Sequence, residues 1–281
     1  MTLVLAHLDD FDVRSRRSQG RVRLMSAGEM YVAAVTPIAS ELASDTKSAP
    51  LAIVTGGSRG LGYEVASGLI RAGHRVVLIA KDPERLMSVA KSLKCDFRSV
   101  DVADSAAFRY ALADIVSKSG PVSTLVLAHG VMSEKLSKTI RTSDAEWRRV
   151  LSINLDAAFT AISAIAPGMV EARNGRIIAF SACLGRMSGP GSAGGLAPYR
   201  ISKAGLNSLI RNFAHESGLG SRGVLVDATC PAHCRTDMGG PDAPRSAEEG
   251  AETAIWLATR EFVPGVDQTG VLWEDRQIIP W

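Results

Sequence analysis

The sequence from Leu51 to the C-terminus alternates between short apolar runs and longer segments of helical periodicity. The apolar runs are rich in β-branched residues and almost uninterrupted, which is typical of strands covered on both faces. Strands that alternate with helices predict βαβ units and therefore a parallel sheet. We expect seven strands, at residues 51–55, 75–80, 97–102, 123–128, 175–181, 223–229 and 270–274.

The segments between these strands predict helices. The last of them begins at Ser246, shortly after a proline, and Glu249 three positions later completes a capping box. Helices are expected near residues 60–72, 83–94, 104–118, 143–172, 198–218 and 246–260. No linker or internal repeat interrupts the alternation, so we predict one α/β domain over residues 49–281.

Residues 1–48 differ from the rest of the chain. The run RSRRSQGRVR at 14–23 is basic, but Asp9, Asp10, Asp12 and Glu29 argue against an organelle presequence. The opening apolar run of eight residues is too short for a secretory signal, and no apolar run reaches the ~20 residues that span a bilayer. We expect an N-terminal extension on a cytoplasmic protein without a membrane span, with organelle targeting by residues 1–48 left open.

Charge and cysteine content exclude several classes of function. A net charge of +3 from 32 basic and 29 acidic residues gives no sustained basic face, so no nucleic-acid partner is predicted. The spacing of Cys95, Cys183, Cys230 and Cys234 fits neither a disulfide framework nor a zinc pattern. The run CPAHC at 230–234 is a weak metal signal, and we predict free thiols in a reducing compartment and no metal.

A glycine-rich loop joins the first predicted strand to the first predicted helix. It reads TGGSRGLG over residues 55–62. Glycines at such a turn let the backbone approach a pyrophosphate, whose charge is met by the helix N-terminus. Because a strand precedes the loop and a helix follows it, we predict dinucleotide binding. The expected contacts come from Gly56, Ser58, Arg59, Gly60, Leu61 and Gly62.

The end of the second predicted strand indicates which nicotinamide cofactor is bound. An NAD site usually has a carboxylate there, which would repel a 2'-phosphate. This chain has Ala80 at that position and Lys81 directly after it, and Arg59 of the glycine loop can approach the same phosphate. We therefore favour NADP(H) over NAD(H), although both cations could also be solvated surface residues.

The spacing G-x-x-x-G-x-G resembles that of the short-chain dehydrogenase/reductase family, and YRISKAGLN at 199–207 is similar to the carbonyl-reductase-like members. The resemblance covers residues 51–281. It implies a Rossmann-type doubly wound parallel sheet, here with seven strands. It also implies that Asp101 and Val102 frame the adenine ring, that Thr236 bonds the cofactor, and that a homo-oligomer forms through the helices near 143–172 and 198–218.

Tyr199 and Lys203 stand four residues apart, so both lie on one face of a helix and can reach one ligand. A tyrosine is a poor base near its ordinary pKa of ~10, and a neighbouring ammonium together with a nicotinamide cation would favour the phenolate. We predict that Tyr199 is the general acid/base and that Lys203 lowers its pKa and holds the cofactor ribose. By resemblance, Asn154 holds a water for proton resupply.

The fourth catalytic position departs from the family pattern. The family usually has two serines at the end of the fifth strand, where this chain has Ser181 and Ala182, and Ala182 falls at the catalytic serine position. Adjacent strand residues point to opposite faces, so Ser181 is a substrate donor only if a bulge turns it. Loss of such a donor typically costs about 100- to 1,000-fold in rate.

We expect an oxidoreductase that reduces a ketone or aldehyde, or oxidises the corresponding alcohol. The alternative is a catalytically degenerate member of the family that binds NADP(H) as a sensor or scaffold, which Ala182 favours and the Tyr199, Lys203 and Asn154 trio opposes. A third reading is an enzyme whose substrate supplies the missing hydroxyl donor. His129 could replace that donor, but a packed structural histidine is the better interpretation.

Overall fold

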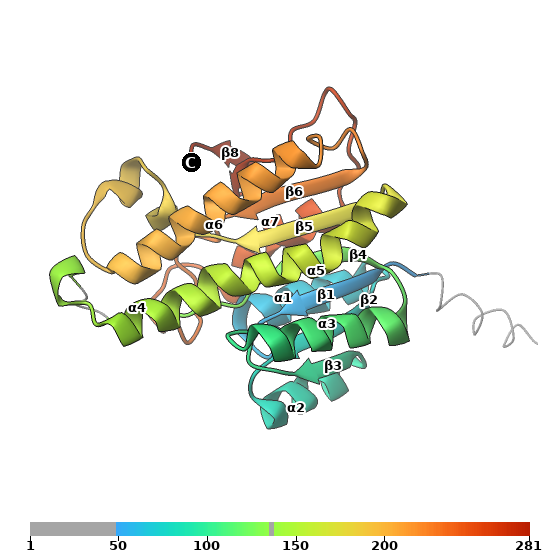
Figure 1. Ribbon diagram of the computed structural model, residues 1–281, viewed down its shortest axis with the longest axis horizontal. Helices are drawn as coiled ribbons and strands as arrows, with labels where there is room; N and C mark the ends of the chain where they lie inside the picture. Colours follow the sequence, from blue (N-terminus) through green and yellow to red (C-terminus); the bar gives the residue numbers. More distant parts are fainter. Residues whose placement is uncertain (1–48, 135–137) are drawn as a thin grey trace, which may run out of the picture. The chain divides into compact units, whose positions relative to one another are not determined.

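The computed structural model describes residues 49–134 and 138–281 (Figure 1). The predicted extension 1–48 lies outside the described residues. The described part forms one sheet in the order β3-β2-β1-β4-β5-β6-β7-β8. The strands are β1 (Leu51–Thr55), β2 (Arg75–Ala80), β3 (Asp96–Ser99), β4 (Val122–Leu127), β5 (Gly175–Phe180), β6 (Val224–Thr229), β7 (Leu272–Glu274) and β8 (Gln277–Ile279).

The first seven strands are parallel, and β8 pairs with β7 in the antiparallel direction. The order of the parallel strands is that of a Rossmann-type doubly wound sheet, with the direction of winding reversed between β1 and β4. The predicted α/β class, the single domain and the parallel sheet are thus confirmed. A crevice forms outside the carboxyl ends of the strands at such a reversal, which is where ligands bind.

Two layers of helices cover the sheet, as expected because most of its strands are nearly continuous apolar runs. Helices α3, α5 and α6 cross one face, with α1 and α7 on the other side (Figure 1). In β1, Ile53 packs with Phe108 of α3, whereas Val54 packs with Leu69 of α1. The long helices are α1 (Gly60–Arg71), α2 (Pro83–Leu93), α3 (Ser105–Ser119), α4 (Asp144–Leu151), α5 (Ala157–Ala172), α6 (Ala197–Glu216) and α7 (Ala247–Thr259).

The prediction of seven strands was one strand short. The eighth strand, β8, follows β7 after only two residues, Asp275 and Arg276, which have φ values of +49° and +60°. Two successive positive φ values are typical of a tight hairpin turn, and such turns usually contain glycine or asparagine. An Asp-Arg pair gives no such signal, so this hairpin could not be recognised. The third strand is also shorter than predicted, because it ends at Ser99.

The predicted long helix at 143–172 is interrupted by a π-helical turn at Ser152–Asp156, between α4 and α5. Helix Asp144–Ala172 is long and apolar enough to cross a membrane, but 50% of its most apolar window is buried within the domain. Ala158, Ala161 and Ile165 of this helix belong to the core beneath the sheet. Burial of this kind is typical of the core helix of a globular domain.

One ion pair is almost completely buried near the end of β6. The Nη2 atom of Arg260 lies 3.2 Å from Oδ2 of Asp227, and their side chains are 6% and 3% exposed. Asp227 also accepts hydrogen bonds from the Gly270 amide at 3.0 Å and from the Trp273 indole at 3.1 Å. These bonds tie the segment before β7 to β6, and they compensate in part for the desolvation of the carboxylate. Burial nevertheless raises the pKa of Asp227.

Candidate active site

The glycine loop leaves β1 at the point where the winding of the sheet reverses. Gly56 has a φ of +68°, and a Cβ added there would lie 2.8 Å from the carbonyl oxygen of Ala128. A Cβ at Gly62 would lie 2.3 Å from the carbonyl oxygen of Gly56. Helix α1 then starts without a side-chain cap and without an acidic residue in its first turn. Its first amides and positive dipole are therefore available to an anion such as a pyrophosphate.

A cleft of about 730 Å³ opens beside this loop. It is lined by every residue outside the Tyr-Lys pair that was predicted to contact the cofactor, namely Gly56, Ser58, Arg59, Gly60, Leu61, Gly62, Lys81, Asp101, Val102 and Thr236. Gly60 and Thr236 are neighbours in this lining, because a Cβ at Gly60 would lie 3.1 Å from Cγ2 of Thr236. The residues present thus fit an extended dinucleotide.

The cations at one end of the cleft are paired with carboxylates. Nζ of Lys81 lies 2.7 Å from Oδ2 of Asp101, and the hydrogen bond from Lys81 is the main reason why the pKa of Asp101 is lowered. Arg59 pairs with Asp237, whose carboxylate is also 3.6 Å from Nη1 of Arg85. Exposed ion pairs of this kind contribute little to stability, so these cations can exchange a carboxylate for a phosphate at small cost.

Arg85 also lines this cleft, although it was not predicted as a site residue. It lies in the first turn of α2, four positions after Lys81. The sequence DPERL at 82–86 could have identified it. Asp82 is a recognisable helix cap directly after Lys81, so the first turn of the capped helix, which contains Arg85, is expected beside the cleft. The capping bond runs from the Arg85 amide to Oδ1 of Asp82 at 3.1 Å.

A second cavity of about 570 Å³ adjoins the cleft. The two share six lining residues: Leu61, Ala128, His129, Gly130, Thr236 and Met238. Tyr199, Lys203, Ser181 and Ala182 line the second cavity, together with Cys183, Cys230 and Glu274. A ligand that extends out of the cleft would therefore meet the predicted catalytic residues, and we refer to this second cavity as the substrate pocket.

Helix α6 positions Tyr199 and Lys203 one turn apart. Both side chains are buried, and Nζ of Lys203 lies 6.0 Å from the centroid of the Tyr199 ring. Nζ donates a hydrogen bond to the carbonyl oxygen of Phe180 at 2.6 Å. The helix begins with Pro198 in its first turn, after Leu196 at a φ of +53°. The ammonium is thus fixed against the end of β5.

Burial dominates the protonation of this pair. It raises the pKa of Tyr199 to about 12, with smaller contributions from Cys230 and Cys183. It also lowers the pKa of Lys203 to about 8. In the protein alone the tyrosine pKa thus moves opposite to the expected direction, because removal of the ring from water disfavours the phenolate. Tyr199 is a protonated phenol at neutral pH and can donate a proton.

Asn154 lies in the π-helical turn and is 1% exposed. Its Oδ1 accepts from the Val131 amide at 2.8 Å, and its Nδ2 donates to the Val131 carbonyl at 2.9 Å and to Oγ of Ser202 at 2.9 Å. The side chain therefore joins the segment after β4 to α6. A Cβ at Gly130 would lie 3.5 Å from Oδ1 of Asn154 and 3.7 Å from Nζ of Lys203, which places both groups around one glycine.

Ser181 lines the substrate pocket, but its hydroxyl is engaged elsewhere. Its Oγ forms a short hydrogen bond with Oδ1 of Asn207, and its amide donates to the Thr229 carbonyl at 2.8 Å. A serine hydroxyl has one hydrogen to donate, so this arrangement leaves none for a substrate oxygen. Ala182 follows with extended backbone angles and offers only a methyl group.

Asn207 was not predicted as a site residue. It lies four positions after Lys203, so it shares the helical face of Tyr199 and Lys203, and its burial resembles theirs. Its Nδ2 donates to the Gly185 carbonyl at 3.3 Å. The i, i+4, i+8 spacing in YRISKAGLN is the signal that could have identified it.

His129 occupies the boundary between the cleft and the substrate pocket. Its Nδ1 lies 2.6 Å from Oγ1 of Thr55, and the side chain is buried. Burial, and then the charge of Lys203, lower the pKa of the imidazole to about 3. The ring is uncharged at neutral pH and held by a hydrogen bond, which is the environment of a structural histidine.

The chain matches the family described as short chain dehydrogenase over residues 50–246. It is 31% identical over 190 residues to 3-oxoacyl-(acyl-carrier-protein) reductase of Escherichia coli strain K12, which covers 67% of this chain and 75% of the relative. The reductase of the same name from Staphylococcus aureus strain Mu50 is 33% identical over 201 residues, with 69% and 76% covered.

Solved structures agree with this relationship. An actinorhodin polyketide ketoreductase crystallised with NADPH is 26% identical, with a TM-score of 0.68 over 78% of this chain and 92% of the ketoreductase. A protein described as a gluconate dehydrogenase from Agrobacterium tumefaciens is also 26% identical, with a TM-score of 0.67 over 74% of this chain and 88% of that protein.

Proposed function

Because the chain belongs to the short-chain dehydrogenase/reductase family, we propose that it is an NADP(H)-dependent oxidoreductase that reduces a ketone or aldehyde, or runs the reverse reaction. The observation that supports this most directly is the junction of two cavities. The glycine loop lines the first, and Tyr199 and Lys203 line the second, with six residues common to both. A cofactor in the first cavity and a carbonyl substrate in the second would meet at these shared residues.

The cofactor supplies the hydride when it is bound. In the proposed reduction the Tyr199 hydroxyl donates its proton to the carbonyl oxygen as negative charge develops there. The raised pKa keeps that proton in place before the reaction. Lys203 has a pKa of about 8, so it is largely charged at neutral pH and stabilises the phenolate that remains.

Asn154 has a positioning role in this proposal. Its two hydrogen bonds to Val131 hold the segment after β4, and its bond to Ser202 holds α6. Both N–H groups of the side-chain amide donate to protein partners, so a resupply water would have to donate to the second lone pair of Oδ1 or bind the backbone.

Selection of NADP(H) over NAD(H) is supported by charge. Lys81, Arg59 and Arg85 line the end of the cleft, and Ala80 stands where a repelling carboxylate would be. A 2'-phosphate would replace Asp101 and Asp237 as the partner of these cations. Guanidinium groups bind phosphate in a bidentate way, which adds geometric selectivity to the charge.

The substrate is proposed to be a ketone, in line with the names of the relatives, which are reductases of 3-oxoacyl chains and a polyketide ketoreductase. Ala182 gives the carbonyl oxygen no hydroxyl donor, and the Ser181 hydroxyl is bonded to Asn207. We therefore expect slow turnover in the parent protein. A substrate with its own hydroxyl beside the carbonyl would compensate for this loss.

The test is oxidation of NADPH by a panel of ketones, aldehydes and 3-oxoacyl thioesters. The fall in NADPH absorbance is measured for four proteins. These are the parent, Ala182→Ser, Tyr199→Phe and the matched control Tyr110→Phe, whose ring is 77% exposed on α3. We expect turnover in the parent and the control and its loss in Tyr199→Phe. Ala182→Ser should raise the rate by about 100-fold, the value of one oxyanion donor.

Three outcomes would change the proposal. Turnover that survives Tyr199→Phe would exclude the proton-donor role. NADPH binding without turnover, relieved only by Ala182→Ser, would favour the sensor or scaffold reading. A fall in rate on restoring the serine would instead favour a substrate that supplies its own donor.

Self-association is a separate prediction. Exposed apolar surface for it is offered by Trp147 on α4, Phe159 on α5 and Ile201 on α6.

A further inference from the structure

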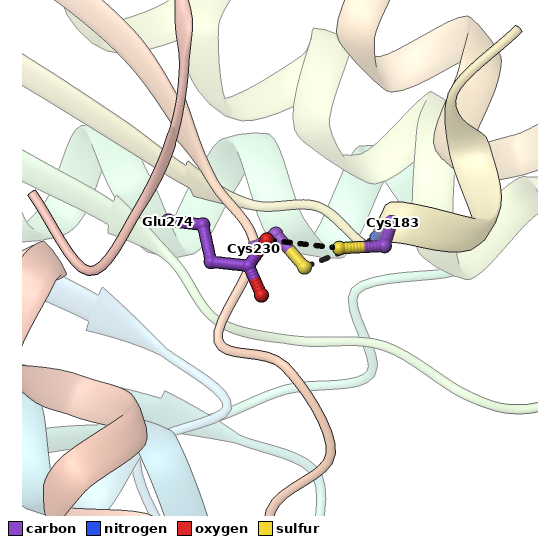
Figure 2. Close-up of side chains that lie close together, drawn as sticks. All are labelled: Cys183, Cys230 and Glu274. Carbon is purple, nitrogen blue, oxygen red and sulfur yellow. Dashed lines mark hydrogen bonds between the residues drawn. The ribbon is translucent and has the colours of Figure 1, made fainter. Parts of the chain in front are cut away.

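Three potential metal ligands meet in the wall of the substrate pocket. Figure 2 shows the side chains of Cys183, Cys230 and Glu274 pointing toward a common point. Their sulfur and carboxylate oxygen atoms all lie within 4.8 Å of one another. The Cys183 thiol lies 3.3 Å from Oε2 of Glu274, and the Cys183 amide donates to Sγ of Cys230 at 3.1 Å.

The topology of the sheet explains this meeting. Strands β5, β6 and β7 are adjacent and parallel, so their carboxyl ends lie along one edge. Cys183 follows the end of β5, Cys230 directly follows β6, and Glu274 is the last residue of β7. The Cys230 amide is itself held by the Trp273 carbonyl at 2.7 Å. The three side chains are therefore positioned by backbone hydrogen bonds rather than by a mobile loop.

The distances suit a thiophilic cation. Zinc binds sulfur at about 2.3 Å and carboxylate oxygen at about 2.0–2.2 Å, so tetrahedral ligand atoms lie about 3.5–3.8 Å apart. The observed Sγ to Oε2 separation of 3.3 Å is close to this range, and the 4.8 Å limit on all pairs leaves only small side-chain movements. The Cys183 amide donates to Cys230 in the way that amides support a metal-bound thiolate.

The charges around the cluster are also favourable. Within residues 49–134 and 138–281, Glu274 forms no ion pair, so its carboxylate has no cationic partner there. Two thiolates and one carboxylate around a divalent cation would leave a single negative charge. Lys203 lines the same pocket and interacts electrostatically with Cys230, so it would face a complementary charge.

We propose that Cys183, Cys230 and Glu274 form a binding site for a thiophilic divalent cation such as Zn²⁺, with its fourth coordination position open to the substrate pocket. Three protein ligands and one open position are typical of reactive rather than structural zinc sites. The pocket itself provides the entry path, because all three residues line it and two of them are only partly buried. This departs from the sequence-based prediction of no metal, which rested on the spacing of the four cysteines and did not consider Glu274.

The site can be tested by titrating Zn²⁺ into tag-free, metal-free protein kept reduced with a phosphine, with heat of binding as the readout. We expect one bound ion per chain. Cys183→Ser, Cys230→Ser and Glu274→Gln should each weaken binding by at least about tenfold, since even outer-sphere changes cost about 10- to 100-fold. Cys95→Ser is the matched control, because Cys95 lies at the start of β3, far along the sheet from the cluster.

A second measurement does not depend on how the variants fold. Co²⁺ added to the unmodified protein should give the ligand-field bands of tetrahedral coordination and a thiolate-to-cobalt charge-transfer band, and Zn²⁺ should displace both. Absence of the charge-transfer band would overturn the proposal. So would full Zn²⁺ affinity in Cys183→Ser, or loss of binding in Cys234→Ser alone, because the ion would then belong to the run at 230–234. None of these readouts requires oxidoreductase activity.

Discussion

Replacement of Lys203 by methionine should change how the stability of the protein depends on pH. Burial lowers the pKa of this ammonium from an ordinary value of 10.5 to about 8. Below about pH 8 the folded and unfolded chains both carry the proton. Above it the folded chain releases the proton, whereas the unfolded chain keeps it until about pH 10.5, so the contribution of Lys203 to the free energy of unfolding rises with pH.

The size of the effect follows from the two pKa values. A difference of about 2.5 pH units corresponds to about 3.4 kcal/mol, which is the cost of keeping the ammonium charged in the folded protein at low pH. Between about pH 7 and about pH 9.5, roughly 2 kcal/mol of this cost is relieved by deprotonation. Methionine has no proton to release and similar length, so Lys203→Met should lack this gain while the rest of the domain titrates as before.

The measurement is equilibrium urea unfolding followed by tryptophan fluorescence at both pH values, at one protein concentration, for the parent and Lys203→Met. The pH dependence of Lys203→Met is then subtracted from that of the parent. This subtraction removes the titration of Tyr199, whose pKa of about 12 makes stability fall above about pH 10 in both proteins. Lys91→Met, exposed on α2, is the control and should behave as the parent does. Equal pH dependence in the parent and Lys203→Met would refute the assignment of a desolvated, depressed lysine.

Three further substitutions have expected outcomes. Arg260→Met should lower the free energy of unfolding by about 3–5 kcal/mol, because it leaves the buried carboxylate of Asp227 unpaired. Arg148→Met breaks an exposed pair and should cost under about 1 kcal/mol, so similar losses in the two variants would contradict the burial argument. Gly62→Ala should abolish NADPH binding in a fluorescence titration, because the new Cβ meets a backbone oxygen at 2.3 Å. Gly168→Ala, with open space around it, should bind NADPH as the parent does, and unchanged NADPH binding in Gly62→Ala would show that the loop can relax. Lys81→Glu should weaken NADPH binding by about tenfold or more and leave NADH binding nearly unchanged; an equal loss for both cofactors would remove the 2'-phosphate argument.

Most of the fold could be predicted because the signals were local and repeated. Most strands of the parallel sheet are apolar on both faces, and the helix that starts at the capping box of Ser246 and Glu249 was found. The eighth strand was missed because its turn uses Asp275 and Arg276 at positive φ, where sequence statistics expect glycine or asparagine. The π-helical turn at 152–156 was missed because its sequence, SINLD, contains no glycine or proline that would mark an interruption of the helix.

The site was predictable where its residues follow one another in the chain and unpredictable where only the fold brings them together. Tyr199 and Lys203 are one helical turn apart, and the glycine loop is a single segment. The cluster of Cys183, Cys230 and Glu274 spans three strand ends, and Glu274 had no feature that singled it out. The direction of the Tyr199 pKa was also beyond the sequence, because it depends on how completely the ring is removed from water.

The side chain of Asn154 has a mechanical consequence for the protein. Its three hydrogen bonds connect the chain segment that borders the cleft beside the glycine loop to α6, the helix that carries Tyr199. Movement of either element would therefore break or stretch hydrogen bonds of this one buried amide, so the two elements are coupled through it. The spacing between the cleft wall at Val131 and the helical face that carries Tyr199 is consequently tied to the single side chain of Asn154.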